Sequence, residues 1–432
     1  MTEPDPPRRL LRAFFDRAVE VADPMRIIPA HLPPKPMGRV IVVGAGKASA
    51  RMAEAVEAAW GPCEGLVLTR YGYGRPTRGI EIAEAAHPVP DAAGAEATAR
   101  MLTLLANLGP EDFALALVSG GASALLVAPA DGITLAEKQA VNAALLASGA
   151  PIGQMNIVRK HLSRVKGGQL AAAAHPARML SLMISDVPGD DPALIGSGPT
   201  VGDASRAADA RAILARWGVA VPHSVEAALA EPTGVVPPDD PRLSRVENRV
   251  IAAPAQSLAA AADLARARGL SVEILGDRVE GEARDVAEAH AGCALAVQNG
   301  LRQGDPGVVV LSGGELTVTR RGDGIGGPNA EYALALALAL DGAPGISAIA
   351  CDTDGVDGAA EVAGAFVDAG TLERARSGGV SGHEALSRND AHRFFAAIGD
   401  QVVTGPTLTN VNDFRAILVN RNSDRISGNA RK

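Results

Sequence analysis

The chain has 432 residues, of which 47% are hydrophobic and 3% aromatic, and its formal net charge is −8. This length allows more than one hydrophobic core, and a sequence rich in Ala and Gly favours closely packed helices and sheets. The acidic balance and the shortage of aromatic residues argue against a general nucleic-acid-binding protein. No stretch of the sequence reaches the roughly 20 apolar residues that a membrane span requires.

The cysteine pattern indicates a reducing compartment. Cys63, Cys293 and Cys351 are odd in number, far apart and not spaced as metal ligands. The first residues contain no apolar core of a secretion signal. We therefore expect a cytoplasmic protein.

Short apolar runs alternate with helical patterns along the first half of the chain. Strands are predicted at residues 39–43, 65–69, 114–118 and 179–184. Thr134 and Glu137 have the spacing of a capping box, which should begin a helix running toward Leu146. Each strand ends in glycine or a polar turn, so the pattern predicts a doubly wound, largely parallel, Rossmann-like α/β sheet.

A second alternating series follows residues 231–241, a Pro-rich acidic stretch that is typical of a linker. Its strands are predicted at residues 249–252, 271–274, 307–311 and 345–350. We predict two α/β domains, 1–235 and 245–420, with the last segment packing on either one. We expect a cleft between them, and ligands of such sheets collect beyond the carboxyl ends of the strands.

The first predicted strand ends in a candidate anion-binding turn. Gly44 and Gly46 precede Lys47 at the start of a helix, where N–H groups, the helix dipole and the lysine charge favour an anion. The turn lacks the spacing of a Walker A loop. It also misses the dinucleotide-binding pattern, because Ser49 occupies the position of the third glycine. A tight turn with a solvated lysine is the alternative.

A second candidate turn follows the strand at 114–118. Ser119, Gly120, Gly121 and Ser123 are its proposed phosphate-binding residues. Successive glycines let the backbone donate several N–H groups to one phosphate, and the serines add hydroxyl groups. An ordinary strand-to-helix turn is the alternative.

The segment 156–168 concentrates positive charge before two glycines. Arg159, Lys160 and Lys166 are candidates for binding phosphate or carboxylate groups. A solvated basic helix face has the same pattern. His161, in the same segment, is equally consistent with a structural histidine.

Grouped carboxylates follow the strand at 179–184. Asp186, Asp190 and Asp191 would repel one another unless a cation such as Mg²⁺ lay between them, although capping residues in exposed turns are the alternative. Weaker candidates at other loops are Gly198, Glu315, Asp354 and Asn410. No pattern of a covalent nucleophile accompanies these groups. Phosphoryl transfer requires this combination of cations, phosphate-binding loops and carboxylates.

Taken in order, GAGKA, HPVPD, SGGAS, NIVRKHLSRVKGG, SDVPGDD, GSGPT, SGGE, GGPNAEYAL, DTDGVDG and TNVND resemble the glycerate 2-kinase family. Its members are often labelled hydroxypyruvate reductase, and their C-terminal region is the MOFRL domain. The resemblance covers nearly the whole chain. It implies ATP- and Mg²⁺-dependent phosphorylation of D-glycerate at the 2-hydroxyl, giving 2-phosphoglycerate and ADP.

The resemblance also implies an active site in the interdomain cleft and roles for the candidate residues. Lys47, Asp186 and Asp190 would be catalytic, and Asp191 would join the two aspartates as a Mg²⁺ ligand. Asn329 and the other candidates would bind substrate or nucleotide. The chain departs from the family pattern at Ala122, where the loop has a glycine. It departs again at Pro328, which stands where the family has an arginine, so one cation of the expected site is missing.

Two other functions remain open at this point. One is an NAD(P)H-dependent hydroxypyruvate reductase, against which the incomplete glycine pattern argues. The other is a non-catalytic metabolite sensor with the same pockets. The expected partners are the small molecules glycerate and ATP, with neither nucleic acid nor membrane; a homodimer is left open.

Overall fold

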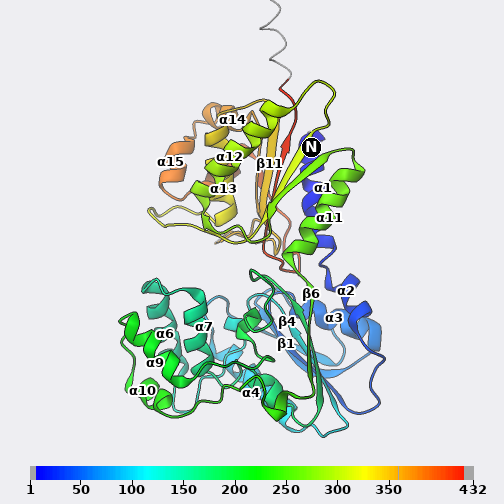
Figure 1. The fold of residues 1–432 in the computed structure, drawn as a ribbon, viewed down its shortest axis with the longest axis vertical. Helices are drawn as coiled ribbons and strands as arrows, with labels where there is room; N and C mark the ends of the chain where they lie inside the picture. The colour runs from blue at the N-terminus through cyan, green and yellow to red at the C-terminus, as the bar shows by residue number, and fades with distance from the viewer. Residues whose placement is uncertain (1–5, 359, 423–432) are drawn as a thin grey trace, which may run out of the picture. The chain divides into compact units, whose positions relative to one another are not determined.

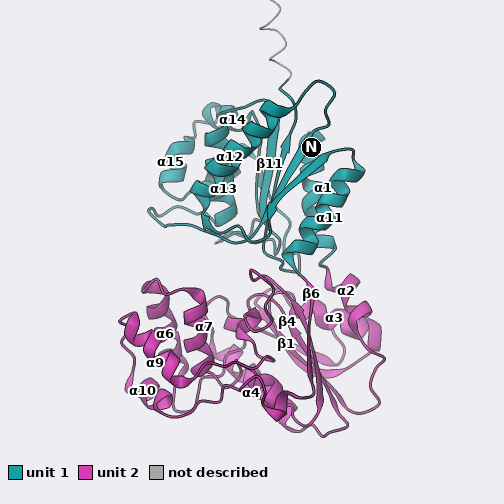
Figure 2. Ribbon diagram, viewed as in Figure 1, with its two compact units in different colours: residues 1–22, 253–432 teal, residues 23–252 magenta. Residues whose placement is uncertain are grey.

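The computed structural model describes residues 6–358 and 360–422, and the chain divides into two compact units (Figure 2). Unit 2 is the continuous segment Asp23–Ala252. Unit 1 combines Met1–Ala22 with Ala253–Lys432. The chain therefore begins in unit 1, builds all of unit 2, and returns to complete unit 1.

Unit 2 contains a six-stranded parallel sheet of order β3-β2-β1-β4-β5-β6. Its strands are β1 (Val40–Ala45), β2 (Glu64–Arg70), β3 (Ile80–Ala85), β4 (Phe113–Val118), β5 (Arg178–Ile184) and β6 (Val246–Ala252). Its helices are α2 (Pro24–His31), α3 (Ser49–Trp60), α4 (Ala92–Ala106), α5 (Ala122–Leu125), α6 (Leu135–Ala147), α7 (Ile152–His161), α8 (Gln169–Ala173), α9 (Ala207–Arg216) and α10 (His223–Ala230). Two short 3₁₀ turns lie at Ile195–Ser197 and Pro241–Leu243.

The central strands of unit 2 are apolar along their whole length because both faces of the sheet are covered. Every residue of β1 and of β4 is buried, as expected for parallel strands between two helix layers. The predicted doubly wound parallel sheet is confirmed. Its strand order reverses between β1 and β4, the position where such folds bind ligands.

A second, all-helical core lies at one end of unit 2, where α6, α7, α9 and α10 gather (Figure 1). Val141, Leu145, Val158 and Leu214 are among its buried residues. The predicted capping box begins α6: Thr134 Oγ1 accepts from Glu137 N at 3.2 Å, and the Glu137 carboxylate accepts from Thr134 N at 2.7 Å. This core fixes the facing sides of α6 and α7.

Unit 1 contains a six-stranded mixed sheet of order β13-β12-β11-β14-β9-β7, in which only β7 and β9 run parallel. Its strands are β7 (Ser271–Gly276), β9 (Val308–Gly313), β11 (Ile346–Asp352), β12 (Gly364–Val367), β13 (Gln401–Val402) and β14 (Asp413–Val419), with the separate pair β8 (Gly281–Glu282) and β10 (Leu316–Thr317). Its helices are α1 (Pro6–Glu20), α11 (Pro254–Ala267), α12 (Ala283–Gly300), α13 (Pro328–Leu340), α14 (Thr371–Ser377), α15 (Gly382–Ser387) and α16 (Ala391–Ile398).

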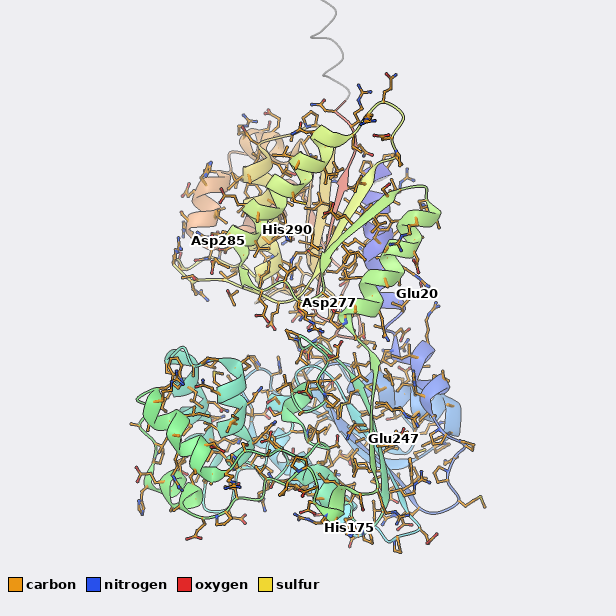
Figure 3. All side chains as sticks on the ribbon, in the orientation of Figure 1. Glu20, His175, Glu247, Asp277, Asp285 and His290 are labelled. Atoms are coloured by element: carbon orange, nitrogen blue, oxygen red, sulfur yellow. The ribbon has the colours of Figure 1, made fainter. Side chains whose placement is uncertain are left out.

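Helices cover both faces of the unit 1 sheet. α12 to α15 lie on one face, and α1 and α11 lie on the other (Figure 1). α13 is buried almost all round, and His290, which projects from α12 (Figure 3), shares a 2.9 Å hydrogen bond with the Tyr332 hydroxyl. On the opposite face Leu11, Phe14 and Phe15 of α1 join the core formed with β11 and β14.

The observed division differs from the predicted ranges 1–235 and 245–420 at both boundaries. The opening helix α1 packs in unit 1, because its apolar face is buried there. The strand predicted at 249–252 is part of β6, which pairs with β5 and belongs to unit 2. Residues 231–241 are therefore not the linker: Val236 is fully buried and its carbonyl accepts from Asp203 N at 2.8 Å.

Two further expectations concern membrane-spanning helices and the cysteines. No helix among the described residues is long and apolar enough to cross a membrane. Cys63, Cys293 and Cys351 are free thiols, and the first and third are buried.

Candidate active site

The turns that follow β1 and β4 lie against each other at the reversal point of the unit 2 sheet. Lys47 N donates to the Gly120 carbonyl at 2.9 Å, and Ala48 N donates to Ser119 Oγ at 3.0 Å. Gly46 N donates to the Leu68 carbonyl at 3.1 Å. The N–H groups of the first turn, which the sequence suggested for anion binding, therefore already donate hydrogen bonds to other residues of the protein.

The glycines of the first turn allow this close approach. A Cβ atom on Gly44 would lie 2.2 Å from the Leu117 carbonyl oxygen. Gly46 has a φ of +138°, and a Cβ there would lie 2.6 Å from the Ser119 carbonyl oxygen. These two residues hold the turns together, and Lys47 is the group of this turn that remains suited to an anion.

The turn after β4 has the better backbone geometry for phosphate. The N–H groups of Gly120 and Gly121 donate to no other residue in the described ranges. Gly121, with a φ of +83°, begins the short helix α5. A Cβ on Gly121 would lie 3.3 Å from Lys47 Cγ and 3.2 Å from the His87 ring. Lys47 and His87 therefore flank this turn, which we call the SGGAS loop (Ser119–Ser123).

The GSGPT segment packs on the SGGAS loop. Ser197 Oγ and Ser123 Oγ are 2.8 Å apart, and a Cβ on Gly196 would lie 2.9 Å from Ala122 Cβ. Gly198 has a positive φ of 61°, and its tight turn brings it against Ala193. The structure thus brings together three of the predicted motifs, from residues 44–47, 119–123 and 196–200.

The basic segment splits between two environments. Arg159 and Lys166 line a cavity of about 280 Å³ that also includes Gly121 and Ser123 of the SGGAS loop. Lys160 instead forms a buried ion pair with Asp203 at 2.5 Å, so we leave it out of the proposed site. His161 shares hydrogen bonds with the hydroxyls of Thr233 at 2.6 Å and Ser205 at 3.1 Å, which favours its structural role.

One lining residue of this cavity was missed from the sequence. Lys138 of α6 is 2% exposed, and its Nζ donates to the Leu162 carbonyl at 2.6 Å. Burial lowers its pKa to about 7, and the Arg159 charge acts in the same direction. One feature of the sequence could have pointed to Lys138. Lysine is rare in this chain, where it accounts for six of the 41 Lys and Arg residues.

The three aspartates predicted as Mg²⁺ ligands are not grouped as a preformed site. Within the described ranges, no set of three or more His, Cys, Asp or Glu side chains is placed to hold a metal ion. Asp191 is exposed, and its Oδ1 accepts from Ala193 N at 2.9 Å, as a turn-capping residue does. Asp186 is half-buried. Asp190 differs, because its Oδ1 is buried and has no hydrogen-bond partner.

In unit 1 the predicted motifs converge around the start of α13. The Asp357 carboxylate accepts from Asn329 N at 2.9 Å and from Ala330 N at 2.8 Å. Asn329 Nδ2 donates to Asp413 Oδ1 at 2.6 Å, and Asp413 Oδ2 accepts from Arg415 at 2.6 Å. The helix terminus that follows the glycines is therefore capped by Asp357 rather than open to a ligand.

This network is buried, and Arg415 connects it to the SGGE turn. Arg415 donates to the carbonyls of Gly313 at 3.2 Å and Gly314 at 3.0 Å. Burial raises the pKa of Asp413 to about 6, and the positive charge of Arg415 opposes this shift. Asn329 Oδ1 and Arg415 Nε are both buried and have no hydrogen-bond partner among the described residues.

The remaining predicted residues of unit 1 lie in the loops next to β9, β11 and β14. Glu315 is exposed after β9. Asp354 is fully buried, and its Oδ1 accepts from Val356 N at 2.7 Å. Asn410 is buried, and its Oδ1 accepts from Asn412 N at 3.2 Å. Pro328 is the first residue of α13, a position where its fixed φ suits a helix start.

A doubly wound sheet with a glycine-rich loop and cations at its reversal point is the arrangement in which α/β proteins commonly bind phosphate groups. Residues 10–230 match the sequence family described as a domain of unknown function, DUF4147, and residues 308–413 match the MOFRL family. The chain is 37% identical over 416 residues to the D-glycerate 2-kinase of Thermotoga maritima, covering 96% of this chain and 98% of that protein.

Two further comparisons also cover nearly the whole chain. The crystal structure of glycerate kinase from Thermotoga maritima has a TM-score of 0.85 and 36% sequence identity, covering 96% of this chain and 100% of that one. An Agrobacterium vitis protein with a provisional hydroxypyruvate reductase name is 52% identical over 419 residues, covering 95% and 94% of the two chains. The chain belongs to the glycerate 2-kinase family.

Proposed function

We propose that this protein transfers the γ-phosphoryl group of ATP to the 2-hydroxyl of D-glycerate, producing 2-phosphoglycerate and ADP. The observation that carries the proposal is the SGGAS loop, whose open N–H groups lie beside Lys47 at the reversal point of the sheet. Relatives named D-glycerate 2-kinase and glycerate kinase match along nearly the whole chain.

We infer separate tasks for the residues of unit 2. Gly120 and Gly121 would donate backbone N–H groups to phosphate oxygens, and Lys47 would neutralise charge as the phosphoryl group moves. Gly44, Gly46 and Ser119 would act by holding the two turns in contact. Phosphoryl transfer depends mainly on such positioning and charge stabilisation, so no covalent nucleophile is required.

Mg²⁺ fits this proposal through Asp190. Its buried Oδ1 lacks a hydrogen-bond partner, which is costly for a carboxylate unless a cation or donor completes it. Mg²⁺ is commonly bound by one or two carboxylates together with substrate phosphates, so a group of three protein ligands is not needed. Asp190 and Asp186 would hold the ion, which when bound would neutralise phosphate charge.

The test is a paired assay on the purified protein. One reaction contains ATP, Mg²⁺ and D-glycerate, with ADP measured; enolase is added to identify the product, since it dehydrates 2-phosphoglycerate and not 3-phosphoglycerate. The other reaction contains hydroxypyruvate with NADH or NADPH. ADP release together with enolase-dependent absorbance is expected. Hydroxypyruvate reduction without ADP release would reject the kinase in favour of the reductase.

We also propose a cytoplasmic location and small-molecule partners alone. Free thiols at Cys63 and Cys351 are consistent with a reducing compartment. The ligands of the proposed reaction, glycerate and ATP, are small anions that a few local cations and N–H groups can bind in an acidic protein.

A further inference from the structure

Three cations share one cavity of unit 2, which we call the triple-cation cavity. Lys138 from α6, Arg159 from α7 and Lys166 line its volume of about 280 Å³, and none of its lining residues is acidic. Within the described ranges, none of the three forms an ion pair with a carboxylate. Their polar partners are neutral: Lys166 Nζ donates to the carbonyls of Ser123 and Leu126 at 2.7 and 3.1 Å.

This arrangement is unfavourable without a ligand. Lys138 and Lys166 are 2% and 1% exposed, so little water reaches either ammonium group. Buried charges are normally paired, because the lost hydration is otherwise not replaced. Burial lowers the pKa of Lys166 well below its usual value, and the charges of Lys138 and Arg159 add to that effect. An anion entering the cavity would relieve both the lost hydration and the mutual repulsion.

The position of the cavity connects it to the proposed reaction. Gly121 and Ser123 of the SGGAS loop form part of its wall, and Gly121 lies against Lys47. Its volume is just below the usual range for drug-sized ligands, which suits an acid of a few heavy atoms better than a whole nucleotide. An adjoining cavity of about 480 Å³ has mostly apolar lining residues and shares Arg159.

We propose that the triple-cation cavity binds the carboxylate of the acceptor acid, and that Lys138 is a specificity-determining residue for it. This inference rests on the proposed kinase function. It assigns the acceptor's carboxylate to α6, α7 and the SGGAS loop.

The test uses Lys138→Met, which keeps the length and apolar stem of the side chain but removes its charge. D-glycerate binding is measured by calorimetry with and without saturating ADP, and KM is measured separately for D-glycerate and ATP. We expect at least a tenfold loss of D-glycerate affinity, an ATP KM within twofold of the parent, and partial recovery in Lys138→Arg. The melting temperature should stay close to that of the parent, because removing a buried charge offsets the lost hydrogen bond to the Leu162 carbonyl.

Arg164→Met is the matched control. Arg164 is exposed, pairs with Asp131 at 3.4 Å and lies outside the cavity lining. The substitution therefore removes one positive charge without changing the cavity. Unchanged D-glycerate affinity in Lys138→Met would overturn the inference. So would a raised ATP KM with a normal D-glycerate KM, which would assign the cavity to nucleotide phosphate.

Failure of the kinase proposal would look different. A parent protein that binds D-glycerate through Lys138 but releases no ADP would keep the carboxylate site and reject the reaction. A parent protein that binds inorganic phosphate in this cavity, but no D-glycerate with or without ADP, would reject the carboxylate assignment.

Discussion

Lys47 lies two residues after the end of β1, and its Cγ is 3.3 Å from the position that a Cβ on Gly121 would occupy. Because its backbone N–H is already bonded to Gly120, its side-chain charge is what it can contribute to an anion. We predict that Lys47→Ala lowers kcat by roughly 10²–10³-fold, the effect of removing one preorganised electrostatic contact. Steady-state kinetics of ADP release will measure this loss.

Lys35→Ala is a suitable control for the Lys47 substitution. Lys35 is exposed in the same unit and donates to the carbonyls of Trp60 and Pro62. The Lys35→Ala variant should have a kcat within twofold of the parent value. The circular dichroism spectra of both variants should match the parent, and near-parental turnover in Lys47→Ala would remove that residue from the mechanism.

Lys138 gives the site a defined pH dependence. Its pKa is about 7 in the folded protein, against 10.5 for an ordinary lysine, and the other charged or titratable lining residues are Arg159, Lys166 and His87. Between pH 7 and 10.5 the unfolded chain binds more protons at this position, so stability from this group rises with pH across that window. A bound carboxylate favours the protonated lysine and should therefore bind more weakly as the pH rises above about 7.

The corresponding measurement is the increase in melting temperature caused by saturating D-glycerate. We expect a larger increase at pH 6.5 than at pH 9. In Lys138→Met the increase should be small at both pH values. An increase that is independent of pH in the parent would show that Lys138 does not titrate in contact with the ligand.

The positions of some site residues could be predicted from the sequence and those of others could not, and the difference has a physical reason. Glycine turns after apolar strands have fixed positions in a parallel sheet, so residues 44–47 and 119–123 were predictable as neighbours. Lys138 was not, because a lysine in the first turns of a capped helix normally extends into water. Its burial depends on α7, because Lys138 Nζ donates to the carbonyl of Leu162 at the end of that helix, and apolar residues of α6 and α7 share one core.

At the scale of elements, the start of α13 depends on one residue from a distant loop. Asp357 accepts two backbone hydrogen bonds there and lies 3.1 Å from His392 Nε2. We predict that Asp357→Ala lowers the free energy of unfolding by about 2 kcal/mol, the upper range for loss of a helix cap. Urea denaturation followed by circular dichroism will measure it.

Ser381→Ala tests whether the Asp357 effect is more than ordinary capping. Ser381 Oγ accepts from Glu384 N at the exposed start of α15, so its loss should cost less, about 0.5–1 kcal/mol. Equal losses in the two variants would mean that the buried network around Asp357 adds nothing to the cap.

Among the elements, apolar strands were predictable and charged ones were not. β1, β4 and β9 are largely apolar runs that lead into glycine-containing turns, and all three were predicted from the sequence. β14 was missed although all seven of its residues are buried, because Arg415 interrupts its apolar pattern. β6 was assigned to the wrong unit, since pairing with β5 is a long-range contact that no local pattern records.

For the whole molecule, the division at Ala252 has a direct test. The fragment 23–252 contains both cores of unit 2 and all six strands of its sheet. We predict that it folds alone with a cooperative urea transition. The fragment 23–235, which follows the boundary suggested by the sequence, lacks β6 and leaves β5 as an unpaired edge, so it should be less stable and aggregate. Identical behaviour of the two fragments would contradict this assignment.

The place of α1 has a consequence for how the protein is made. Phe14 and Phe15 pack beside Phe414 and Ala416, which are synthesised about 400 residues later. At synthesis rates of about 5–20 residues per second, that interval is roughly 20–80 s. All of unit 2 is synthesised within this interval, so unit 2 can fold before α1 meets its partners in β11 and β14. Until those strands are made, part of the apolar face of α1 has nothing to pack against, and a chaperone would be expected to bind there.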